Sequence, residues 1–441
     1  MYHHYTVDEH LLRCVGVLAE IEAGTYPEYA LANDLMRTIQ PSHREALHVA
    51  LFLHDVAKGR VEDHSIAGAR IARSLCPRLG CSPAETETVA WLIENHLVMS
   101  TVAQSRDLSD RKTIENFSSI VQSLERMKLL TILTTADIRA VGPGVWNGWK
   151  AQLLRALYYE TEPALTGGFS EVDRAKRVAM AQAEFRAELS DWPSEELERY
   201  IARLYPAYWL KVELPRKVAH ARFVRAAGHD GRSLATDVGF DAMRGVTELT
   251  VLAPDHPWLL SYLAGACAMA GANIVDAQIY TTTDGMALDT LAISREFDHD
   301  EDEGRRADRI AATIEKALQG DLRLPDVVAK RGSAKGRILA FAVEPEVIIN
   351  NQWSNRYTVI EISGLDRPGL LYELTATLSK LNLNIASAHV ATFGERAVDV
   401  FYVTDLMGAK ISSPTRNAAV KRALIGLFAL PQDGEKKAAG I

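Results

Sequence analysis

The sequence predicts a multidomain protein in which an all-α domain is followed by two α+β modules. Three observations indicate this. Up to about residue 205, apolar residues recur at helical spacing. From residue 245 onward, β-branched residues alternate with polar ones, and the segment that begins there returns once more along the chain. A chain of 441 residues has room for about two to four domains.

The composition is that of an ordinary soluble globular protein, with 47% hydrophobic and 24% charged residues. The formal net charge of −8 argues against nucleic acid as a partner, because no strongly basic field is present to displace phosphate counterions. The longest apolar stretch, residues 258–275, is broken by Gly265 and Gly271 and is too short for a membrane span. Four cysteines without a C-x-x-C pair indicate reduced thiols and a cytoplasmic protein.

Residues 1–205 are predicted to form the helical domain. Ser82 and Glu85 form a capping box around Pro83, which opens a helix. The next segment, residues 206–244, contains several glycines and short β-like runs, which predicts an irregular linker. Apolar residues recur at helical spacing in residues 9–23, 41–57, 84–93, 110–140 and 146–159.

Residues 245–335 are predicted to form the first α+β module and residues 336–430 the second. Each has the order strand, helix, strand, strand and helix, and the tail at 431–441 is polar and predicted to be flexible. Seven residues of the first module recur 111 positions later, which indicates an internal duplication. They are Asp255, Pro257, Leu260, Asn273, Ile274, Ala277 and Thr281, which correspond to Asp366, Pro368, Leu371, Asn384, Ile385, Ala388 and Thr392.

His54 and Asp55 stand together at the polar end of an apolar helix, where both side chains can face one cation. Imidazole and carboxylate suit Mg²⁺, Mn²⁺, Fe²⁺ or Zn²⁺, and the two oxygens of Asp55 could bridge two ions. A pair of ions activates water at neutral pH and clamps phosphate oxygens. Lys58, about one helical turn from His54, could contact a phosphate oxygen. The further candidate ligands flank apolar runs: His10, His64, His96 and Asp137.

A histidine on its own is more often a hydrogen-bonded core or surface residue than a ligand. This interpretation suits the histidines outside the set, such as His43, His48 and His220. For the combination of His10, the His54-Asp55 pair and Asp137, metal binding is the favoured interpretation, because all are polar positions beside apolar helices.

The order H…HD…D resembles the signature of the HD superfamily of metal-dependent phosphohydrolases. The surrounding segments HHYTVDEHLLR, FLHDVAKGR, DHSIAGA, IENHLVMS and TTADIRAVGPGVWNGWK are similar to one family, the bifunctional PII uridylyltransferase/uridylyl-removing enzymes (GlnD). That family also carries an N-terminal nucleotidyltransferase domain with a Gly-rich loop and a D-x-D pair, which this sequence does not supply. The resemblance therefore implies removal of UMP and sensing, with uridylyltransferase activity expected only of a full-length enzyme.

Carried over by residue, the resemblance implies that His10, His54, Asp55 and Asp137 hold a principal Mg²⁺ or Mn²⁺ ion. His64 and His96 would contribute to a second. The reaction would be hydrolysis of the phosphodiester between uridylate and a tyrosine of the nitrogen-regulatory protein PII. His54, Asp55 and Lys58 would be its catalytic residues, with Asp55 orienting or deprotonating the attacking water and tyrosinate leaving.

The turn at Asp366, Arg367, Gly369 and Leu370 joins a strand to a helix N-terminus, where free N–H groups and the helix dipole attract a carboxylate. Gly369 permits close approach to the backbone. Asp366 could pair with an ammonium group, and Asn384 could hydrogen-bond both ends of an amino acid. This pattern resembles the ACT domain, a ferredoxin-like βαββαβ module that pairs side by side and binds amino acids. The resemblance implies glutamine as the effector.

The first repeat offers Asp255 and Asn273 but has Trp258 in place of the glycine, so the second repeat is the preferred glutamine site. Pairing of ACT modules also leaves self-association open, and both repeats could instead serve only to brace the hydrolase. Two other functions remain alternatives: a (p)ppGpp-type HD nucleotide hydrolase with ACT regulation, and a non-catalytic amino-acid sensor. The filled H…HD…D set argues against the second.

Overall fold

The computed structural model of the chain describes residues 5–24, 26–108, 110–142, 145–146, 148–166, 171–241, 246–297, 299–322, 343–367, 369–393 and 396–428. The predicted tail at 431–441 lies outside these residues. The chain divides into two compact units. The helical unit contains residues 1–201, 205–218 and 241–245, and the sensor unit contains residues 202–204, 219–240 and 246–441. No helix among the described residues is both long and apolar enough to cross a membrane.

The helical unit confirms the predicted all-α class. Its helices are α1 (Val7–Ala23), α2 (Ala30–Met36), α3 (Pro41–Leu53), α4 (His64–Leu75), α5 (Pro83–Asn95), α6 (Val98–Ser105), α7 (Arg111–Val121), α8 (Leu124–Ala140), α9 (Gly148–Thr166), α10 (Glu171–Glu188), α11 (Ser194–Ala202) and α12 (Pro206–Lys211). Helix α13 (Leu214–His229) begins in this unit and continues from residue 219 in the sensor unit. Short 3-10 turns at Pro27–Tyr29 and Cys76–Leu79 precede α2 and follow α4. The capping box at the start of α5 is present, with Ser82 N–H donating to Glu85 Oε2 at 2.8 Å.

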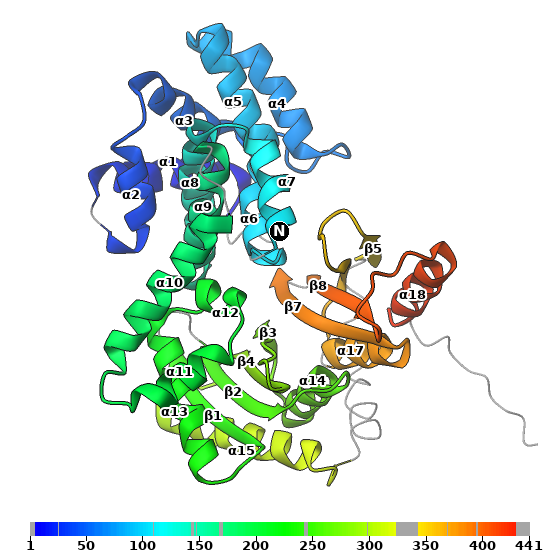
Figure 1. Cartoon of the computed structure of the whole chain (residues 1–441). Coiled ribbons are helices and arrows are strands. Elements are labelled where there is room, and N and C mark those ends of the chain that lie inside the picture. The colour runs from blue at the N-terminus through cyan, green and yellow to red at the C-terminus, as the bar shows by residue number, and fades with distance from the viewer. Residues whose placement is uncertain are drawn as a thin grey trace, which may run out of the picture. The chain divides into compact units, whose positions relative to one another are not determined.

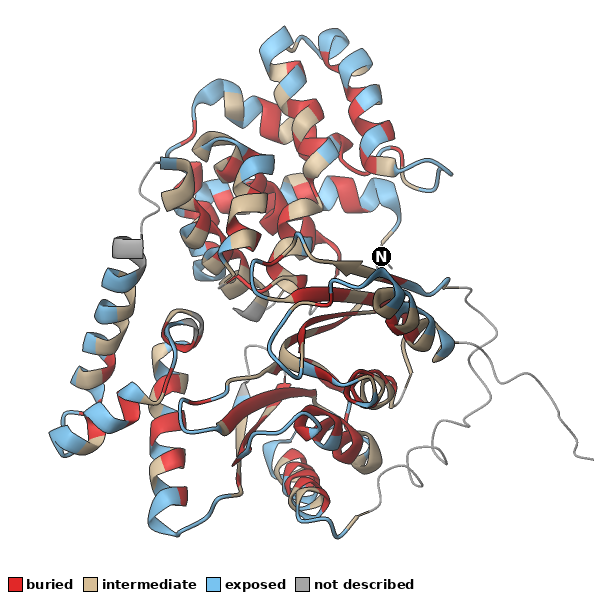
Figure 2. Cartoon of the chain, turned by 45° about the vertical axis from the view of Figure 1, so that its right-hand side comes forward, coloured by how far each residue is buried: buried red, intermediate tan, exposed pale blue. Residues whose placement is uncertain are grey.

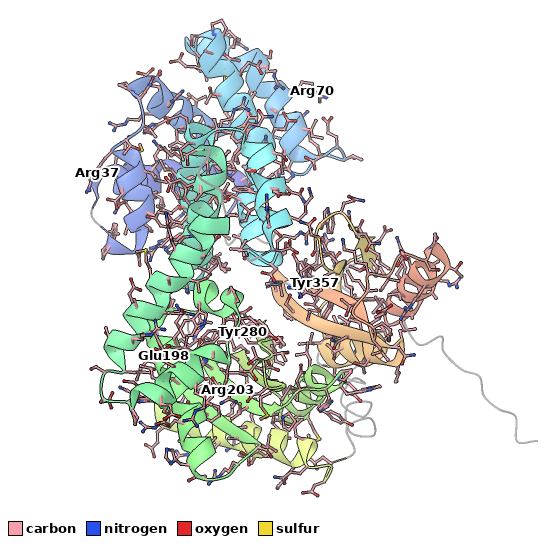
Figure 3. The ribbon with its side chains drawn as sticks, in the orientation of Figure 1. Arg37, Arg70, Glu198, Arg203, Tyr280 and Tyr357 are labelled. Carbon is pink, nitrogen blue, oxygen red and sulfur yellow. The ribbon has the colours of Figure 1, made fainter. Side chains whose placement is uncertain are left out.

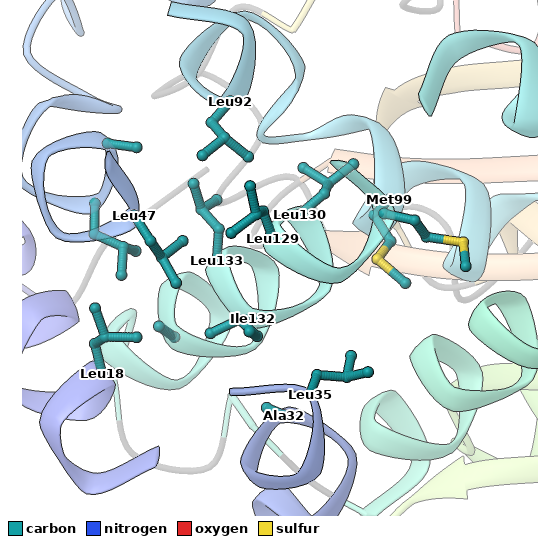
Figure 4. Packing of buried hydrophobic residues seen from close by; sticks show 14 of the residues in the cluster. Leu18, Ala32, Leu35, Leu47, Leu92, Met99, Leu129, Leu130, Ile132 and Leu133 are labelled. Atoms are coloured by element: carbon teal, nitrogen blue, oxygen red, sulfur yellow. The ribbon is translucent and has the colours of Figure 1, made fainter. Parts of the chain in front are cut away.

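Helix α8 is the centre of the helical core. Almost all of its side chains from Leu129 to Ile138 are buried, so it is surrounded by other helices rather than half exposed. Figure 4 shows Leu129, Leu130, Ile132 and Leu133 among residues from the neighbouring helices. A polar residue near the end of such a helix lies in the interior, which is the position of Asp137. The helices around it keep exposed outer faces, as on α4, where Arg70 pairs with Glu62 (Figures 2 and 3).

The prediction that residues 206–244 form an irregular linker was wrong. This segment contains α12, α13 and strand β1 (Ala235–Asp241). Of the glycines that suggested a loop, Gly228 lies in the last turn of α13, and Gly239 lies within β1. Gly231, just beyond α13, has φ +66°, as a residue that terminates a helix does. Trp209 of α12 is 1% exposed and packs edge-on against Phe185 of α10, which ties the segment to the helical unit.

The sensor unit confirms the predicted ferredoxin-like α+β class. Two four-stranded sheets have the orders β1-β2-β4-β3 and β5-β6-β8-β7, and Figure 1 shows both with their helices. The elements of the first are β1, β2 (Val246–Pro254), α14 (Leu259–Ala270), β3 (Ile274–Gln278), β4 (Met286–Ser294) and α15 (Asp300–Leu318). Those of the second are β5 (Glu346–Asn350), β6 (Thr358–Leu365), α17 (Leu370–Lys380), β7 (Leu383–Phe393), β8 (Arg396–Asp405) and α18 (Pro414–Gly426).

The strand order along the chain differs from the βαββαβ plan in one respect. In each module, one outer strand pairs with the first strand of the repeat. This outer strand precedes the repeat in sequence: β1 pairs with β2, and β5 pairs with β6. Strand β5 follows the first repeat in sequence, yet it pairs antiparallel with β6 of the second. Each module is therefore ββαββα, because this outer position can be filled from either end of the repeat.

The two modules of the sensor unit pack side by side. Helices α14 and α17 are in contact, and so are strands β3 and β7 at the margins of their sheets. Leu260 of α14 belongs to the hydrophobic core of the second module. Ser379 Oγ at the end of α17 donates to the Pro257 carbonyl at 2.8 Å. The two copies of the duplication therefore share an interface that is built into a single chain.

Candidate functional site

The candidate metal ligands of the helical unit lie at the ends or on the buried faces of five helices and at one turn. His54 is the C-cap of α3 and His96 is the C-cap of α5, while His64 begins α4. His10 lies on the buried face of α1 and Asp137 on α8. Helix ends converge here, so residues far apart in sequence meet in one place.

The two C-cap histidines are oriented in the same way. His54 Nδ1 lies 2.9 Å from the Leu51 carbonyl, and His96 Nδ1 lies 2.7 Å from the Ile93 carbonyl. The last carbonyls of a helix have no partner within the helix, so each can accept an N–H from the ring. When Nδ1 carries the proton, Nε2 presents its lone pair, and this is the form in which imidazole binds a metal ion.

One group of donor atoms contains His10, His54 and Asp137. The His10 and His54 Nε2 atoms are 3.3 Å apart, and both face Asp137 Oδ1, at 3.1 Å from His10 and 3.6 Å from His54. The two histidines are fully buried. Three borderline or hard donors this close together, in a region closed to bulk water, suit a divalent cation.

A second group contains His64, His96 and the adjacent Asp55. Asp55 Oδ1 lies 3.5 Å from His64 Nε2 and 3.8 Å from His96 Nε2. Its other oxygen, Oδ2, lies 3.9 Å from His54 Nε2 of the first group. The carboxylate of Asp55 thus faces both groups with different oxygens, and the structure brings together all six predicted metal-ligand residues.

Lys58 differs from its predicted position. Helix α3 ends at Leu53, so Lys58 is not one helical turn from His54 on a continuous helix but lies in the turn that follows. Its Nζ donates to Asp55 Oδ2 at 2.6 Å, and its side chain is about a quarter exposed. The ammonium group therefore stands at the open side of the site, beside the carboxylate that faces both groups.

Burial and neighbouring charges shift the pKa values of three candidate metal ligands, Asp137, His96 and His54. Burial alone would raise the pKa of Asp137, but hydrogen bonds from His10 and His54 hold that pKa well below its usual range. Burial and the charge of His54 lower the pKa of His96 to about 4, so its ring is neutral at pH 7. For His54, burial opposes the charged ring, yet hydrogen bonding to Asp137 and the nearby carboxylates raise the pKa.

The hydrogen bond between His54 and Asp137 predicts how the affinity for a metal ion depends on pH. A cation that binds His54 must displace the proton that Asp137 helps to hold there. We therefore expect Mn²⁺ affinity to fall up to about tenfold per pH unit below the raised pKa of His54, with one proton released on binding. Calorimetric Mn²⁺ titration in two buffers of different ionisation enthalpy measures both quantities, and an affinity unchanged between pH 8 and pH 5 would contradict the assignment.

Cys14 is a member of the first group that the sequence prediction missed. Its Sγ lies 3.5 Å from His10 Nε2, and the thiol is fully buried. Cys14 follows His10 by four residues on α1, so both side chains lie on one face of the helix. That spacing was the available signal. Burial raises the pKa of the thiol, which keeps it protonated beside His10.

Gly68 of α4 permits the close helix packing behind the second group. A Cβ at this position would meet Ile93 Cγ2 of α5 at 2.9 Å and the His54 carbonyl at 3.6 Å. Gly68→Ala should therefore push α4, with His64, away from α5, with His96. We expect the affinity for Mn²⁺, measured by calorimetric titration, to fall about tenfold or more, because a shift of the groups that orient metal ligands has effects of this size. Gly16→Ala on α1, where a Cβ meets nothing within 4 Å, is the matched control in the same assay.

The sensor unit contains a cavity of about 460 Å³ between its two modules. The predicted residues Asp366, Arg367, Gly369 and Leu370 line it from the second module, and Asn273 lines it from the first. Gly369 has φ +83° as the N-cap of α17, a conformation that favours glycine. The predicted site thus coincides with a cavity of a size suited to a small molecule.

Two other predicted effector residues are not among those that line this cavity. Asn384 is exposed on β7, and Asp255 accepts a hydrogen bond from Thr281 Oγ1 at 2.7 Å. Trp258, which replaces the glycine in the first repeat, has an ordinary φ of −98° and is 37% exposed, so it is not a core residue. Arg367 is held by Glu373 and by the Leu427 carbonyl.

Sequence reasoning also missed Asp399 and Thr392 as lining residues of the cavity. Both were visible in the duplication, since Thr281 corresponds to Thr392 and Asp289 to Asp399 with one residue less between them. The period-two pattern of a strand predicts which face such residues take, but not that a cavity lies beside them.

Comparison with known proteins confirms the resemblance drawn from the sequence. Residues 7–130 match the HD domain, and residues 358–410 match the ACT domain. Bifunctional uridylyltransferase/uridylyl-removing enzymes are 73% identical over 97% of this chain in Bradyrhizobium diazoefficiens, and 70% identical over its whole length in Rhodopseudomonas palustris. A third, from Nitrobacter hamburgensis, is 72% identical over 429 residues. The chain spans 46% to 48% of these relatives, about half their length.

Proposed function

We propose that this chain carries the uridylyl-removing activity of the bifunctional uridylyltransferase/uridylyl-removing enzymes. It matches an HD domain and an ACT domain, and nearly its whole length is similar to about half the length of those enzymes. The observation that supports this most directly is Asp55, whose two oxygens face two separate groups of metal ligands. Such a carboxylate suits a centre of two divalent cations, for which Mg²⁺ or Mn²⁺ are our preferred ions and Fe²⁺ or Zn²⁺ the alternatives.

We assign each residue of the site a separate role in phosphodiester hydrolysis. When bound, divalent cations lower the pKa of water and neutralise phosphate charge. His10, His54 and Asp137 would hold one ion, and His64 and His96 would contribute to the other. Asp55, whose oxygens face both groups, would accept the proton of the attacking water. Lys58 lies at the more open side, where its ammonium group can contact a phosphate oxygen as a point charge.

The substrate we assign is uridylylated PII, in which UMP is attached to a tyrosine. Tyrosinate is a good leaving group because the pKa of a phenol is about 10, so the site needs little general acid assistance. The side chains of His64 and Lys58 are each about a quarter exposed beside fully buried ligands, which fits a substrate that approaches on a protein surface. The four cysteines are free thiols, which accords with a cytoplasmic site of action.

For regulation, we assign glutamine to the cavity between the two modules of the sensor unit. The helix N-terminus at Gly369 attracts a carboxylate, and Asp366 offers a charge to an ammonium group. Both functions belong to one chain, so occupancy of the cavity can alter hydrolysis.

The experiment is release of UMP from uridylylated PII by this chain with Mn²⁺, with and without glutamine. We expect metal-dependent release that glutamine alters and that His54→Ala/Asp55→Ala abolishes. His48→Ala is the matched control, because His48 lies outside the site and contacts the Arg44 carbonyl. Hydrolysis of guanosine tetraphosphate in preference to uridylylated PII would replace the proposed substrate. No hydrolysis of either by a folded chain with metal bound would favour a non-catalytic sensor.

A further inference from the structure

Asp399 is a buried acid with an unsatisfied oxygen in the wall of the sensor cavity. The residue is 2% exposed, and its Oδ1 has no hydrogen-bond partner among the residues that the structure describes. On β8 it alternates with Val398 and Val400, so it shares the sheet face of Ala397 and Phe401, which pack in the core with α17. A buried polar atom without a partner is rare in folded proteins and calls for a specific explanation.

The surroundings of Asp399 offer it no cation. Among the residues that line the cavity, the titratable ones are Asp366, Arg367, Tyr372 and Asp399 itself. The Arg367 guanidinium is already bound to Glu373 and to the Leu427 carbonyl. Asp366 accepts from Thr392 Oγ1 at 3.2 Å and adds a second negative charge. The first module contributes alanines, glycine, Asn273 and Ile274, none of which is charged.

Burial and the charge of Asp366 raise the pKa of Asp399 to about 8. At neutral pH its carboxyl is therefore mostly protonated in the empty cavity. A cationic group placed beside it would favour the charged form. A hydrogen-bond donor that carries a positive charge thus matches both the orphaned oxygen and the electrostatics of this wall.

We propose that Asp399 receives the ammonium group of an amino-acid ligand in the cavity, and that it selects for ligands that carry this group. The inference rests on the proposed effector function and adds the residue that recognises one end of the effector. The ligand carboxylate points to the N-terminus of α17 at Gly369, and Asp366 and Thr392 stand beside the ammonium group. On binding, the proton of Asp399 passes to solvent and the ligand remains a zwitterion.

Asp289 of the first module can be compared directly with Asp399 of the second. Asp289 occupies the equivalent position on β4 and is also buried, at 1% exposed. Its Oδ1, however, accepts from the Tyr280 N–H at 3.2 Å, and Tyr280 is labelled in Figure 3. Asp289 does not line the cavity. In the second module the equivalent N–H, that of Ala391, also bonds to the carboxyl of Asp399, yet Asp399 Oδ1 is left without a partner among the described residues and Asp399 lines the cavity.

The test is calorimetric titration of the full chain with two probes. They are glutamine and 4-carbamoylbutanoate, which is glutamine without its amino group. We expect the unaltered chain to prefer glutamine by at least about thirtyfold, in line with the cost of leaving a buried polar group unpaired. Asp399→Asn should lose this preference, whereas Asp289→Asn should keep it. Glutamine affinity should also rise from pH 6 to pH 8, with proton release that Asp399→Asn abolishes.

The outcomes separate this inference from the effector proposal. If the unaltered chain binds glutamine and Asp399→Asn binds it equally well and with equal preference, the role of Asp399 is overturned and the effector proposal stands. If the unaltered chain does not bind glutamine, the effector proposal fails, and with it this role of Asp399. Thermal unfolding controls for folding: Asp399→Asn removes a buried acid, so its melting temperature at pH 8 should match or exceed that of the unaltered chain. A collapse in melting temperature would instead indicate a structural role and overturn the inference.

Discussion

Asp55→Asn should lower UMP release from uridylylated PII by at least about a thousandfold, which corresponds to about 4 kcal/mol of transition-state stabilisation. The substitution keeps the size of the side chain but removes the charge that faces both groups of ligands. Burial alone would raise the pKa of Asp55, yet His54 and Lys58 hold that pKa below its usual range, so the carboxylate is ionised at neutral pH. Asparagine cannot bridge two cations in the same way or accept a proton from water.

The same variant should alter metal content as well as rate. We expect two Mn²⁺ ions per chain in the unaltered protein and weaker binding of at least one of them in Asp55→Asn, measured by equilibrium dialysis. Lys58→Met separates the contact between Lys58 and Asp55 from metal binding by Asp55. Because Lys58 donates to Asp55 but is not a metal ligand, this variant should slow hydrolysis while it keeps both ions. Full activity of Asp55→Asn at saturating Mn²⁺ would remove Asp55 from the mechanism.

Glu303→Leu should reduce the stability of the first sensor module by about 3–5 kcal/mol, the usual result of leaving a buried charge without its partner. Glu303 of α15 is fully buried and accepts from Arg306 Nη1 at 2.6 Å. It also accepts from Thr247 Oγ1 of β2 at 2.8 Å and from two backbone N–H groups, at Glu296 and Phe297. Leucine would remove this acceptor from all four donors, and Arg306 would keep only the Ser294 carbonyl and the more exposed Glu296 among the contacts of the described residues.

Hydrogen exchange of the amides in β2 and β4 measures this effect within one module of a multidomain chain. Glu301→Leu is the matched control on the same helix, because Glu301 is exposed and its carboxylate pairs with the neighbouring side chain of Arg305 at the surface. Burial raises the pKa of Glu303, but its four donors lower that pKa overall, so its contribution should be present at neutral pH and lost in acid. Unchanged exchange in Glu303→Leu would show that Arg306 is satisfied by Glu296 alone.

The residues of the candidate metal site were predictable because each stands at a local signal. His54 and His96 follow apolar helices, and Asp137 is the one acidic residue in the buried stretch of α8 from Leu129 to Ile138. Which ligands group together was not predictable, because the convergence of α1, α3, α4, α5 and α8 depends on packing. The partner of Lys58 could not be predicted either, since it depends on α3 ending at Leu53 rather than continuing.

In the sensor unit, too, local features could be predicted from the sequence, and features that depend on packing could not. The duplication fixed the two modules and the turn at Asp366 and Gly369, because these are local features of the repeat. The outer strands β1 and β5 were missed as members of the sheets, since they precede the duplicated segments and β5 pairs across a long sequence separation. The role of Asp399 depends on a cavity that two modules form together, which no single strand pattern encodes.

The central claim is that Asp55 joins two groups of ligands into one centre for hydrolysis. Anomalous diffraction from crystals of this chain soaked in Mn²⁺ tests it most directly. We predict two peaks, one in contact with His10, His54 and Asp137 and the other with His64 and His96, with Asp55 bonded to both. A single peak that Asp55 does not contact, or no peak within the helical unit, would contradict the account.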